Sequence, residues 1–310
     1  MNKKKLFANL GLLLAALIWG STFVAQSEGV KLVDPFTYQS MRSFIGGIVL
    51  LPIIFLRENT AKKSSDYNPP SKKDKKLLLI AGICCGLALT LAACLQQFGI
   101  RYTTVGKAGF ITSLYVIFVP IAGLLFKRKI RPIVWLSILI AAVGMYLLCM
   151  TESLSLSLGD TYVLLCALCF TVHIMVIDHF DRYCDPIKMS CIQFFTSGII
   201  AGILMFIFEK PSISAILSAW LPIAYAGVLS SGVAFTLQVV CQKNTEPPVA
   251  ALLMSLESVF AVLSGAIVLG QIPTAREAVG CIIMFAAIIL AQLPPIKLTR
   301  TKQVTPDNKV

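Results

Sequence analysis

The sequence predicts an all-α integral membrane protein with ten transmembrane helices, arranged as two inverted five-helix repeats. Three observations predict this fold: an apolar composition, ten apolar stretches of membrane-spanning length, and an internal duplication with an odd number of helices per unit. Of the 310 residues, 57% are hydrophobic and only 14% are charged. A soluble domain cannot cover so much apolar surface with polar groups, so a lipid bilayer is the expected environment.

The net charge of +12 comes from short clusters of Lys and Arg that lie between the apolar stretches. Because these clusters form no continuous basic face, nucleic acid is not an expected partner. Most of the ten cysteines lie inside apolar stretches, where Cys acts as a small buried hydrophobe. Cys166 and Cys169 have the spacing of a metal site, but no second Cys or His pair accompanies them. We therefore expect no disulfide framework, no metal and no other cofactor.

Each transmembrane helix is expected where about 17 to 25 consecutive residues are mostly apolar, because that length crosses ~30 Å of hydrocarbon. A helix also satisfies its own backbone hydrogen bonds in lipid. The first stretch is expected to stay in the mature protein, because no small-x-small cleavage site follows it. The connections are short, apart from the basic segment 57–76 and a polar tail after Pro295. The expected spans are 7–26, 36–56, 77–99, 106–126, 132–150, 158–178, 188–208, 218–241, 248–270 and 276–293.

The positions of Lys and Arg predict the orientation, because cytoplasmic loops are enriched in both residues. If the N-terminus is cytoplasmic, that side carries Lys3 to Lys5, the 57–76 segment, the 127–131 cluster and a basic tail. The opposite side carries only Lys31, Arg101, Lys107, Lys210 and Arg276. Ten crossings also return the C-terminus to the side of the N-terminus. We therefore expect a multi-pass protein of the cytoplasmic membrane with both termini in the cytoplasm.

Two stretches of the first half align with the second half, which predicts an internal duplication. Residues 95–130 align with 237–272 without a gap, at an offset of 142. Further upstream the offset is 151. The identities include Gln96 with Gln238, Ser113-Leu114 with Ser255-Leu256, Phe44 with Phe195, and Gly47 with Gly198. Because the unit has five helices, the second copy enters the membrane from the opposite side, and a substrate site is expected between the repeats near the midplane.

Three short motifs carry a resemblance to a known family. They are Trp19-Gly20-Ser21-x-Phe23, Arg42-Ser43-Phe44, and Glu257-x-x-Phe260 followed by Leu269-Gly270-Gln271. They resemble the signature positions of EamA-type transporters in the drug/metabolite transporter superfamily. The resemblance implies repeats at 7–150 and 158–293, a cytoplasmic tail at 294–310, a central cavity between helices 1–4 and 6–9, and peripheral helices 5 and 10. Known members export amino acids and other small metabolites or carry nucleotide sugars.

Arg42 and Glu257 are ionisable side chains expected at lipid depth, where a charge is costly. Arg42 could neutralise an anionic substrate group such as a carboxylate, or it could clamp helices or snorkel outward. Glu257 lies near the middle of its helix, so it needs a hydrogen-bond donor or a bound proton. It is the leading candidate for substrate contact or proton coupling, and fixing the helix packing is the structural alternative.

Four further residues complete the predicted substrate-binding or coupling set. Thr22 and His173 are equivalent at the 151 offset, which favours positions facing the cavity. His173 could relay a proton or simply be hydrogen-bonded. Tyr115 is equivalent to Glu257 at the 142 offset, and Trp19 offers a large rigid face with one N–H group. Ordinary helix packing is the alternative reading of these positions.

The predicted function is a secondary transporter that moves a small metabolite, such as an amino acid, by alternating access at a midplane cavity. The resemblance favours export, and a proton is the candidate coupling ion. A flippase for a lipid or lipid-linked sugar is the alternative on the same fold. An enzyme is not expected, because no nucleophile and base are paired by spacing. Direct ATP drive is not expected either, because no Gly-x-x-x-x-Gly-Lys-Ser/Thr motif occurs. The sequence assigns no oligomeric state.

Overall fold

The computed structural model describes residues 3–63, 69–103, 105–149, 157–269 and 273–293. The expected tail 294–310 and the motif residues Gly270 and Gln271 lie outside these ranges. Within the described residues, nine helices are long and apolar enough to cross a membrane, and one shorter apolar helix covers Pro132–Leu148. All regular elements in this part of the chain are helical. The predicted all-α fold with ten membrane-spanning segments is confirmed.

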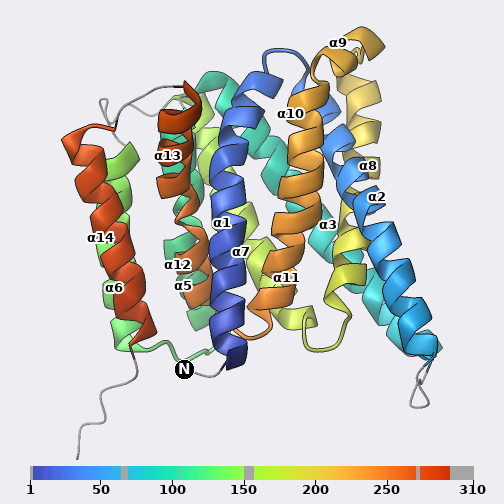
Figure 1. Ribbon diagram of the computed structural model, residues 1–310, viewed down its shortest axis with the longest axis horizontal. Coiled ribbons are helices and arrows are strands. Elements are labelled where there is room, and N and C mark those ends of the chain that lie inside the picture. Colours follow the sequence, from blue (N-terminus) through green and yellow to red (C-terminus); the bar gives the residue numbers. More distant parts are fainter. Residues whose placement is uncertain (1–2, 64–68, 104, 150–156, 270–272, 294–310) are drawn as a thin grey trace, which may run out of the picture.

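The two halves of the chain contain the same series of five spans (Figure 1). The first half consists of α1 (Lys3–Gly29), α2 (Pro35–Lys62), α3 (Lys72–Tyr102), α4 (Val105–Ser113) with α5 (Tyr115–Leu125), and α6 (Pro132–Cys149). The second half begins with α7 (Leu158–Phe180) and α8 (Pro186–Phe208), followed by the short α9 (Ile213–Ser218). Its remaining spans are α10 (Trp220–Tyr225) with η1 (Ala226–Phe235) and α11 (Thr236–Gln242), α12 (Pro247–Met254) with α13 (Glu257–Leu269), and α14 (Ala275–Gln292).

Several helices begin at residues whose side chains cap the free backbone N–H groups. Ser71 caps α3, Ser157 caps α7 and Thr274 caps α14, each in a capping box with an acidic residue three positions later. Asp185 caps α8 through the N–H groups of the two residues after its proline. These local signals place the helix starts close to the membrane boundaries expected from hydropathy.

Contacts between α2 and α8 are related by a pseudo-two-fold axis. A Cβ atom added to Gly47 would lie 3.1 Å from the ring of Phe195, and one added to Gly198 would lie 3.1 Å from the ring of Phe44. The 151 offset converts the first pair into the second. A two-fold relation between the repeats produces this exchange, because each contact must then occur twice with the partners swapped. The inverted repeat is thus visible in individual side-chain contacts.

The 151 offset also relates the polar contacts at one end of the α2–α8 pair to those at the other end. At one end, Glu209 accepts hydrogen bonds of 2.8 Å from the backbone N–H and the hydroxyl of Thr37. At the other end, Lys188 donates to Glu58 at 2.5 Å. The 151 offset relates Glu58 to Glu209 and Thr37 to Lys188. Equivalent positions thus join α2 and α8 at both ends, with a hydroxyl and backbone contact at one end and an ion pair at the other.

Helices α6 and α14 form a separate pair at one edge of the bundle (Figure 1). Gly144 and Gly280 allow this close approach, because a Cβ on either residue would lie 2.7 to 3.0 Å from the other's carbonyl oxygen. Small residues permit such contacts between membrane helices. The fifth and tenth spans, α6 and α14, are therefore peripheral, as expected.

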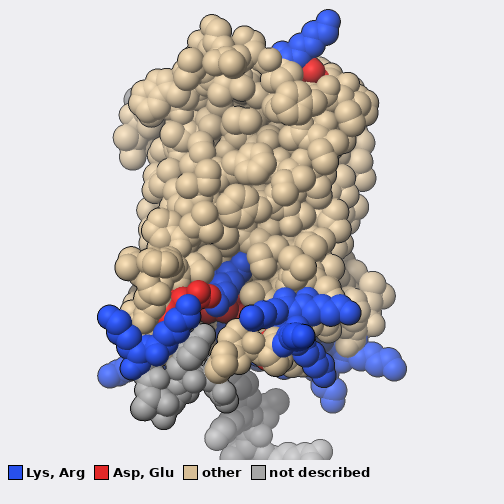
Figure 2. Space-filling model, turned by 90° about the vertical axis from the view of Figure 1, so that its right-hand side faces the viewer, with Lys and Arg blue, Asp and Glu red and all other residues tan. Residues whose placement is uncertain are grey.

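Charged residues are distributed unequally between the two ends of the molecule. The face drawn in Figure 2 has a broad band without charged side chains, and Lys and Arg gather at its lower end. This is the end at which α1 begins in Figure 1, and we call it the basic end. An uncharged band between polar ends is the surface expected of a protein that crosses a membrane.

Candidate functional site: a cavity between the repeats

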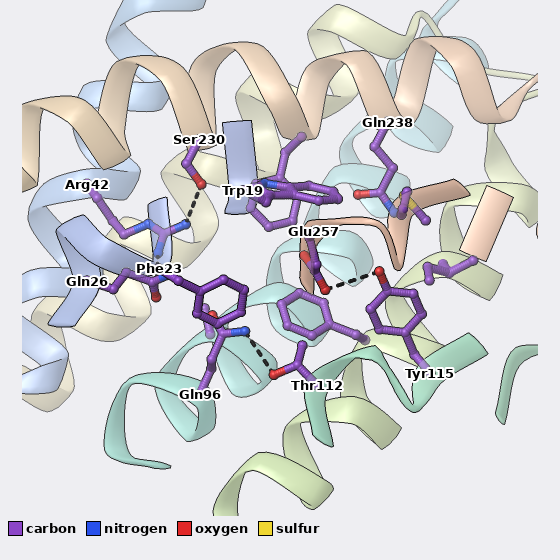
Figure 3. A pocket seen from close by; sticks show the side chains of 15 residues that line it. Trp19, Phe23, Gln26, Arg42, Gln96, Thr112, Tyr115, Ser230, Gln238 and Glu257 are labelled. Atoms are coloured by element: carbon purple, nitrogen blue, oxygen red, sulfur yellow. Dashed lines mark hydrogen bonds between the residues drawn. The ribbon is translucent and has the colours of Figure 1, made fainter. Parts of the chain in front are cut away.

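A cavity lies between the two repeats, and the space around its lining that is not occupied by atoms, open solvent included, is about 510 Å³ (Figure 3). Its lining comes from α1, α2, α3, α4 and α5 of the first half, and from α7, η1, α11, α12 and α13 of the second. The peripheral helices α6 and α14 contribute no lining residue among those described. Four residues of the predicted set line it, namely Trp19, Arg42, Tyr115 and Glu257.

Two interrupted helices meet at this cavity. The fourth span is broken at Leu114, between α4 and α5, and the ninth is broken at Ser255 and Leu256, between α12 and α13. The 142 offset relates Leu114 to Leu256, so the breaks occupy equivalent positions in the two repeats. Discontinuous helices place helix termini near the middle of a membrane, where they can face a cavity. No pattern in the sequence predicts these two interruptions of the helices.

Glu257 lies at the first residue of α13, directly after the break, and is only 5% exposed. Its Oε1 accepts hydrogen bonds from Tyr115 at 3.2 Å and from Ser113 at 3.3 Å. The dipole of α13 favours a carboxylate at this position. Because Tyr115 and Glu257 are equivalent residues, a contact between them lies on the pseudo-two-fold axis itself. Among the described residues, Glu257 forms no ion pair.

Arg42 extends from α2 toward η1 and is 4% exposed. Its guanidinium donates to Ser230 at 3.2 Å, to Ser231 at 3.4 Å and to Gln26 Oε1 at 3.5 Å. All three partners are neutral, and Arg42 forms no ion pair with any described residue. The two serines belong to a π-helical segment, a rare conformation that is frequent at functional sites. In Figure 3, Arg42 and Gln26 lie at one side of the cavity, and Glu257 with Tyr115 at the other.

Aromatic rings form part of the wall of the same cavity. Trp19 of α1 and Phe170 of α7 are equivalent at the 151 offset, and both contact the ring of Phe235 in η1. The ring centroids of Trp19 and Phe235 are 4.8 Å apart, and those of Phe170 and Phe235 are 6.4 Å apart and nearly parallel. The cavity therefore combines two ionisable side chains with a large rigid apolar surface.

Thr22 and His173 correct the expectation that both face the cavity, since neither is a lining residue. Thr22 is fully buried, and its hydroxyl donates to the Ile18 carbonyl at 2.6 Å. His173 is also fully buried; its Nε2 lies 3.1 Å from Gln193 Oε1, and the ring of Phe235 packs edge-on against it. The equivalence at the 151 offset relates two positions but does not determine which way a side chain points.

Two glutamines that the sequence analysis aligned with each other but did not place in the candidate site, Gln96 and Gln238, are buried lining residues. Gln96 is 6% exposed and donates to Thr112 at 3.3 Å, and Gln238 is 2% exposed. Their equivalence at the 142 offset is the feature of the sequence that identifies both as candidate cavity residues. Gln26 could also have been found, because its spacing from Trp19 places both on one face of α1. By contrast, no sequence pattern identifies Ser230 as a lining residue.

Comparisons with known proteins agree with this architecture. Residues 6–150 and 157–293 each match the EamA-like transporter family. An uncharacterized transporter of Archaeoglobus fulgidus is 33% identical over 292 residues, which cover 94% of this chain and 87% of that protein. Protein PagO of Salmonella typhimurium is 26% identical over 248 residues, which cover 76% of this chain and 77% of PagO. One crystal structure shares the fold with a TM-score of 0.74 and 18% sequence identity, covering 92% of this chain and 96% of its own.

The two family matches fall on α1 to α6 and on α7 to α14, which are the two series of five spans. The duplication seen in the side-chain contacts is therefore a duplication of one family unit. The breaks, the buried charges and the aromatic wall all lie where these two units meet. Since both units match and a relative aligns along nearly the whole chain, this multi-pass membrane protein belongs to the EamA-like transporter family.

Proposed function

We propose that this protein is a secondary transporter that exports a small zwitterionic metabolite, an amino acid or a similar solute, across the cytoplasmic membrane. Transport would proceed by alternating access at the cavity between the repeats. Two similar half-bundles related by an axis in the membrane plane can rock against each other and expose one site to either side. Family membership supports the transporter class, and the choice of solute rests on the charges of the cavity.

The observation that carries this choice is the separation of Arg42 from Glu257. Both are buried in the same cavity, and neither has a counter-charge among the described residues. A buried charge without a partner is costly, and a ligand of opposite charge can offset that cost. The planar guanidinium suits a carboxylate, and the carboxylate of Glu257 suits an ammonium group. A zwitterion supplies both groups, and the aromatic wall accommodates its apolar part.

The experiment is counterflow in proteoliposomes with radiolabelled amino acids, nucleosides and sugars, alongside a fluorescent phospholipid. We expect saturable exchange of at least one amino acid. Its decarboxylated amine and its N-acetylated form should fail to compete, because each lacks one of the two charges. Arg42→Gln should lower this exchange at least tenfold, about 1.4 kcal/mol in binding. Arg57→Gln serves as the matched control, because Arg57 is half exposed and pairs with Asp185 at the basic end.

Three results would overturn the proposal. Exchange of neutral sugars or nucleosides without any amino acid would show that the two charges do not select the solute. Translocation of the phospholipid alone would favour a flippase. Competition by the amine or by the N-acetylated analogue as strong as that by the parent amino acid would show that one of the two charged groups does not contact the solute.

A further inference from the structure

Ten buried polar side-chain atoms among the described residues have no hydrogen-bond partner. Two of them belong to residues that line the cavity, namely Nε1 of Trp19 and Oε1 of Gln238. The first is a donor and the second is an acceptor. Burying such groups without partners is unfavourable, so an unpaired donor and an unpaired acceptor on the same cavity require an explanation.

The positions of these two side chains are well determined by their surroundings. Trp19 packs against Phe235, and Gln238 follows Phe235 by three residues, nearly one helical turn. The amide nitrogen of Gln238 has only a long contact of 3.5 Å with Gln242 Oε1. Both side chains are at least nine-tenths buried.

Other amides around the cavity are engaged within the protein. Gln26 Oε1 accepts from Arg42, and Gln96 Nε2 donates to Thr112. The contrast with Gln238 is informative, because Gln96 is its equivalent in the other repeat. One wall of the cavity therefore holds a satisfied glutamine side-chain donor, whereas the opposite wall holds an unsatisfied acceptor.

We propose that Trp19 and Gln238 form a specificity subsite for a neutral polar group of the solute, a hydroxyl or a carboxamide. This inference rests on the proposed transport of a zwitterion, whose charged groups contact Arg42 and Glu257. The acceptor atom of a hydroxyl or carboxamide suits the indole N–H, and its donor group suits the glutamine carbonyl. An apolar group of the same shape would leave both protein groups unpaired, and sites of this kind reject such analogues strongly.

Isosteric amino acids test the subsite directly in proteoliposomes. Threonine and valine have nearly the same shape and differ in the hydroxyl, and asparagine and leucine differ in the carboxamide. We expect wild-type protein to transport the polar member of at least one pair about tenfold more efficiently than the apolar member. Gln238→Leu and Trp19→Phe should each bring this ratio close to one. Gln96→Leu is the matched control, which should retain the ratio even where it lowers the absolute rate.

Thermal stability provides a second readout that does not depend on the solute. Because Gln238 Oε1 has no partner, Gln238→Leu should melt no lower than wild type. A clear drop in its melting temperature would show that the amide holds helices together, and would overturn the subsite. So would equal transport of both members of every pair by wild type, or an unchanged ratio in Gln238→Leu. Absence of transport for all four amino acids would overturn the subsite, whereas the zwitterion proposal would fail only if counterflow with the full amino-acid panel also showed no exchange.

Discussion

Glu257 occupies a position that only one pair of residues can have in a two-fold bundle. It contacts its own equivalent, Tyr115, on the pseudo-two-fold axis, and this pair breaks the symmetry chemically with a carboxylate on one side and a phenol on the other. A group on the axis stays near the centre while the two repeats rock around it. Glu257 is therefore well placed to contact the solute or to exchange a proton in both states of the cycle.

Substitution of Glu257 separates a coupling role from a packing role. If Glu257 exchanges a proton, transport should vary with pH in wild type, and Glu257→Gln should abolish that dependence because the amide cannot titrate. If it only contacts other side chains, Glu257→Gln should leave both the rate and the pH profile near wild type. Glu257→Leu should then chiefly lower the melting temperature. The measurement is uptake rate against pH for wild type and both variants, together with their thermal stability. An unchanged profile in the Gln variant would rule out coupling through this residue.

At the scale of the elements, α1 and α13 pack so closely at Gly20 that one methyl group added there should push the two helices apart. A Cβ atom on Gly20 would lie 2.7 Å from the Glu257 carbonyl oxygen and 2.7 Å from the Ala261 nitrogen. Both contacts are to backbone, which cannot rotate away as a flexible side chain can. Small residues such as Gly20 permit this close approach between membrane helices.

Gly20→Ala should therefore destabilise the protein by about 1–3 kcal/mol through overpacking. Gly109→Ala is the matched control, because Gly109 is also helical but nothing lies within 4 Å of its added Cβ. There the higher helix propensity of alanine should leave stability unchanged or raise it by up to about 1 kcal/mol. Thermal melting of the purified variants measures both. Equal melting temperatures for the two variants would contradict the packing argument.

Helix α7 carries the cavity-lining face onward to the basic end. Phe170 and Ile174 line the cavity, and Asp178 and Asp181 follow on the same face at helical spacing. Asp178 forms an ion pair with Arg128, from the loop that follows α5. An ion pair between α7 and the loop after α5 thus lies on this face at the basic end.

Asp181 should make stability depend on pH. Burial and the neighbouring Asp178 raise the pKa of Asp181 to about 6, although Arg182, Lys243 and Arg128 oppose the shift. The native state therefore binds more protons than the unfolded state between about pH 4 and pH 6, so this contribution falls as pH rises through that window. Asp181→Asn should stabilise the protein at pH 7 by about 1 kcal/mol, after allowance for solvent screening, and should flatten the profile. Melting temperatures from pH 4 to pH 8 test this, and a parallel profile in the variant would contradict it.

The whole molecule presents one basic end and one end poor in Lys and Arg. We expect the basic end to face the cytoplasm, because positive charges near membrane segments are retained there. Tyr183 and Ser212 are exposed residues in loops at opposite ends of α8. In a background without native cysteines, Ser212→Cys should react with an impermeant maleimide in intact cells, and Tyr183→Cys only after permeabilisation. Labelling of both residues from the same side would refute this orientation.

The order of residues along the chain was sufficient to predict the membrane-spanning segments and the internal duplication. Hydropathy is a property of consecutive residues, so helix positions follow from it directly. The alignments at 142 and 151 preserve helix order and relate Phe44 to Phe195, but only the structure shows that the centroids of the two rings lie 6.3 Å apart. Arg42 and Glu257 were candidates for the cavity because ionisable groups at lipid depth are costly, Tyr115 because it is equivalent to Glu257, and Trp19 because of its large rigid face, and all four line the cavity.

Tertiary structure alone decided which way side chains point and where helices break. His173 and Gln96 lie on their helices as the sequence requires, but the rotation of each helix depends on the partners that pack against it. That rotation buries His173 beside Phe235 and turns Gln96 into the cavity. The residues at the two breaks, Leu114 and Leu256, are neither Gly nor Pro, the residues that would predict an interruption of a helix. They persist because a protein cavity can accommodate backbone groups that lipid could not, and whether a cavity lies there depends on ten helices packed together.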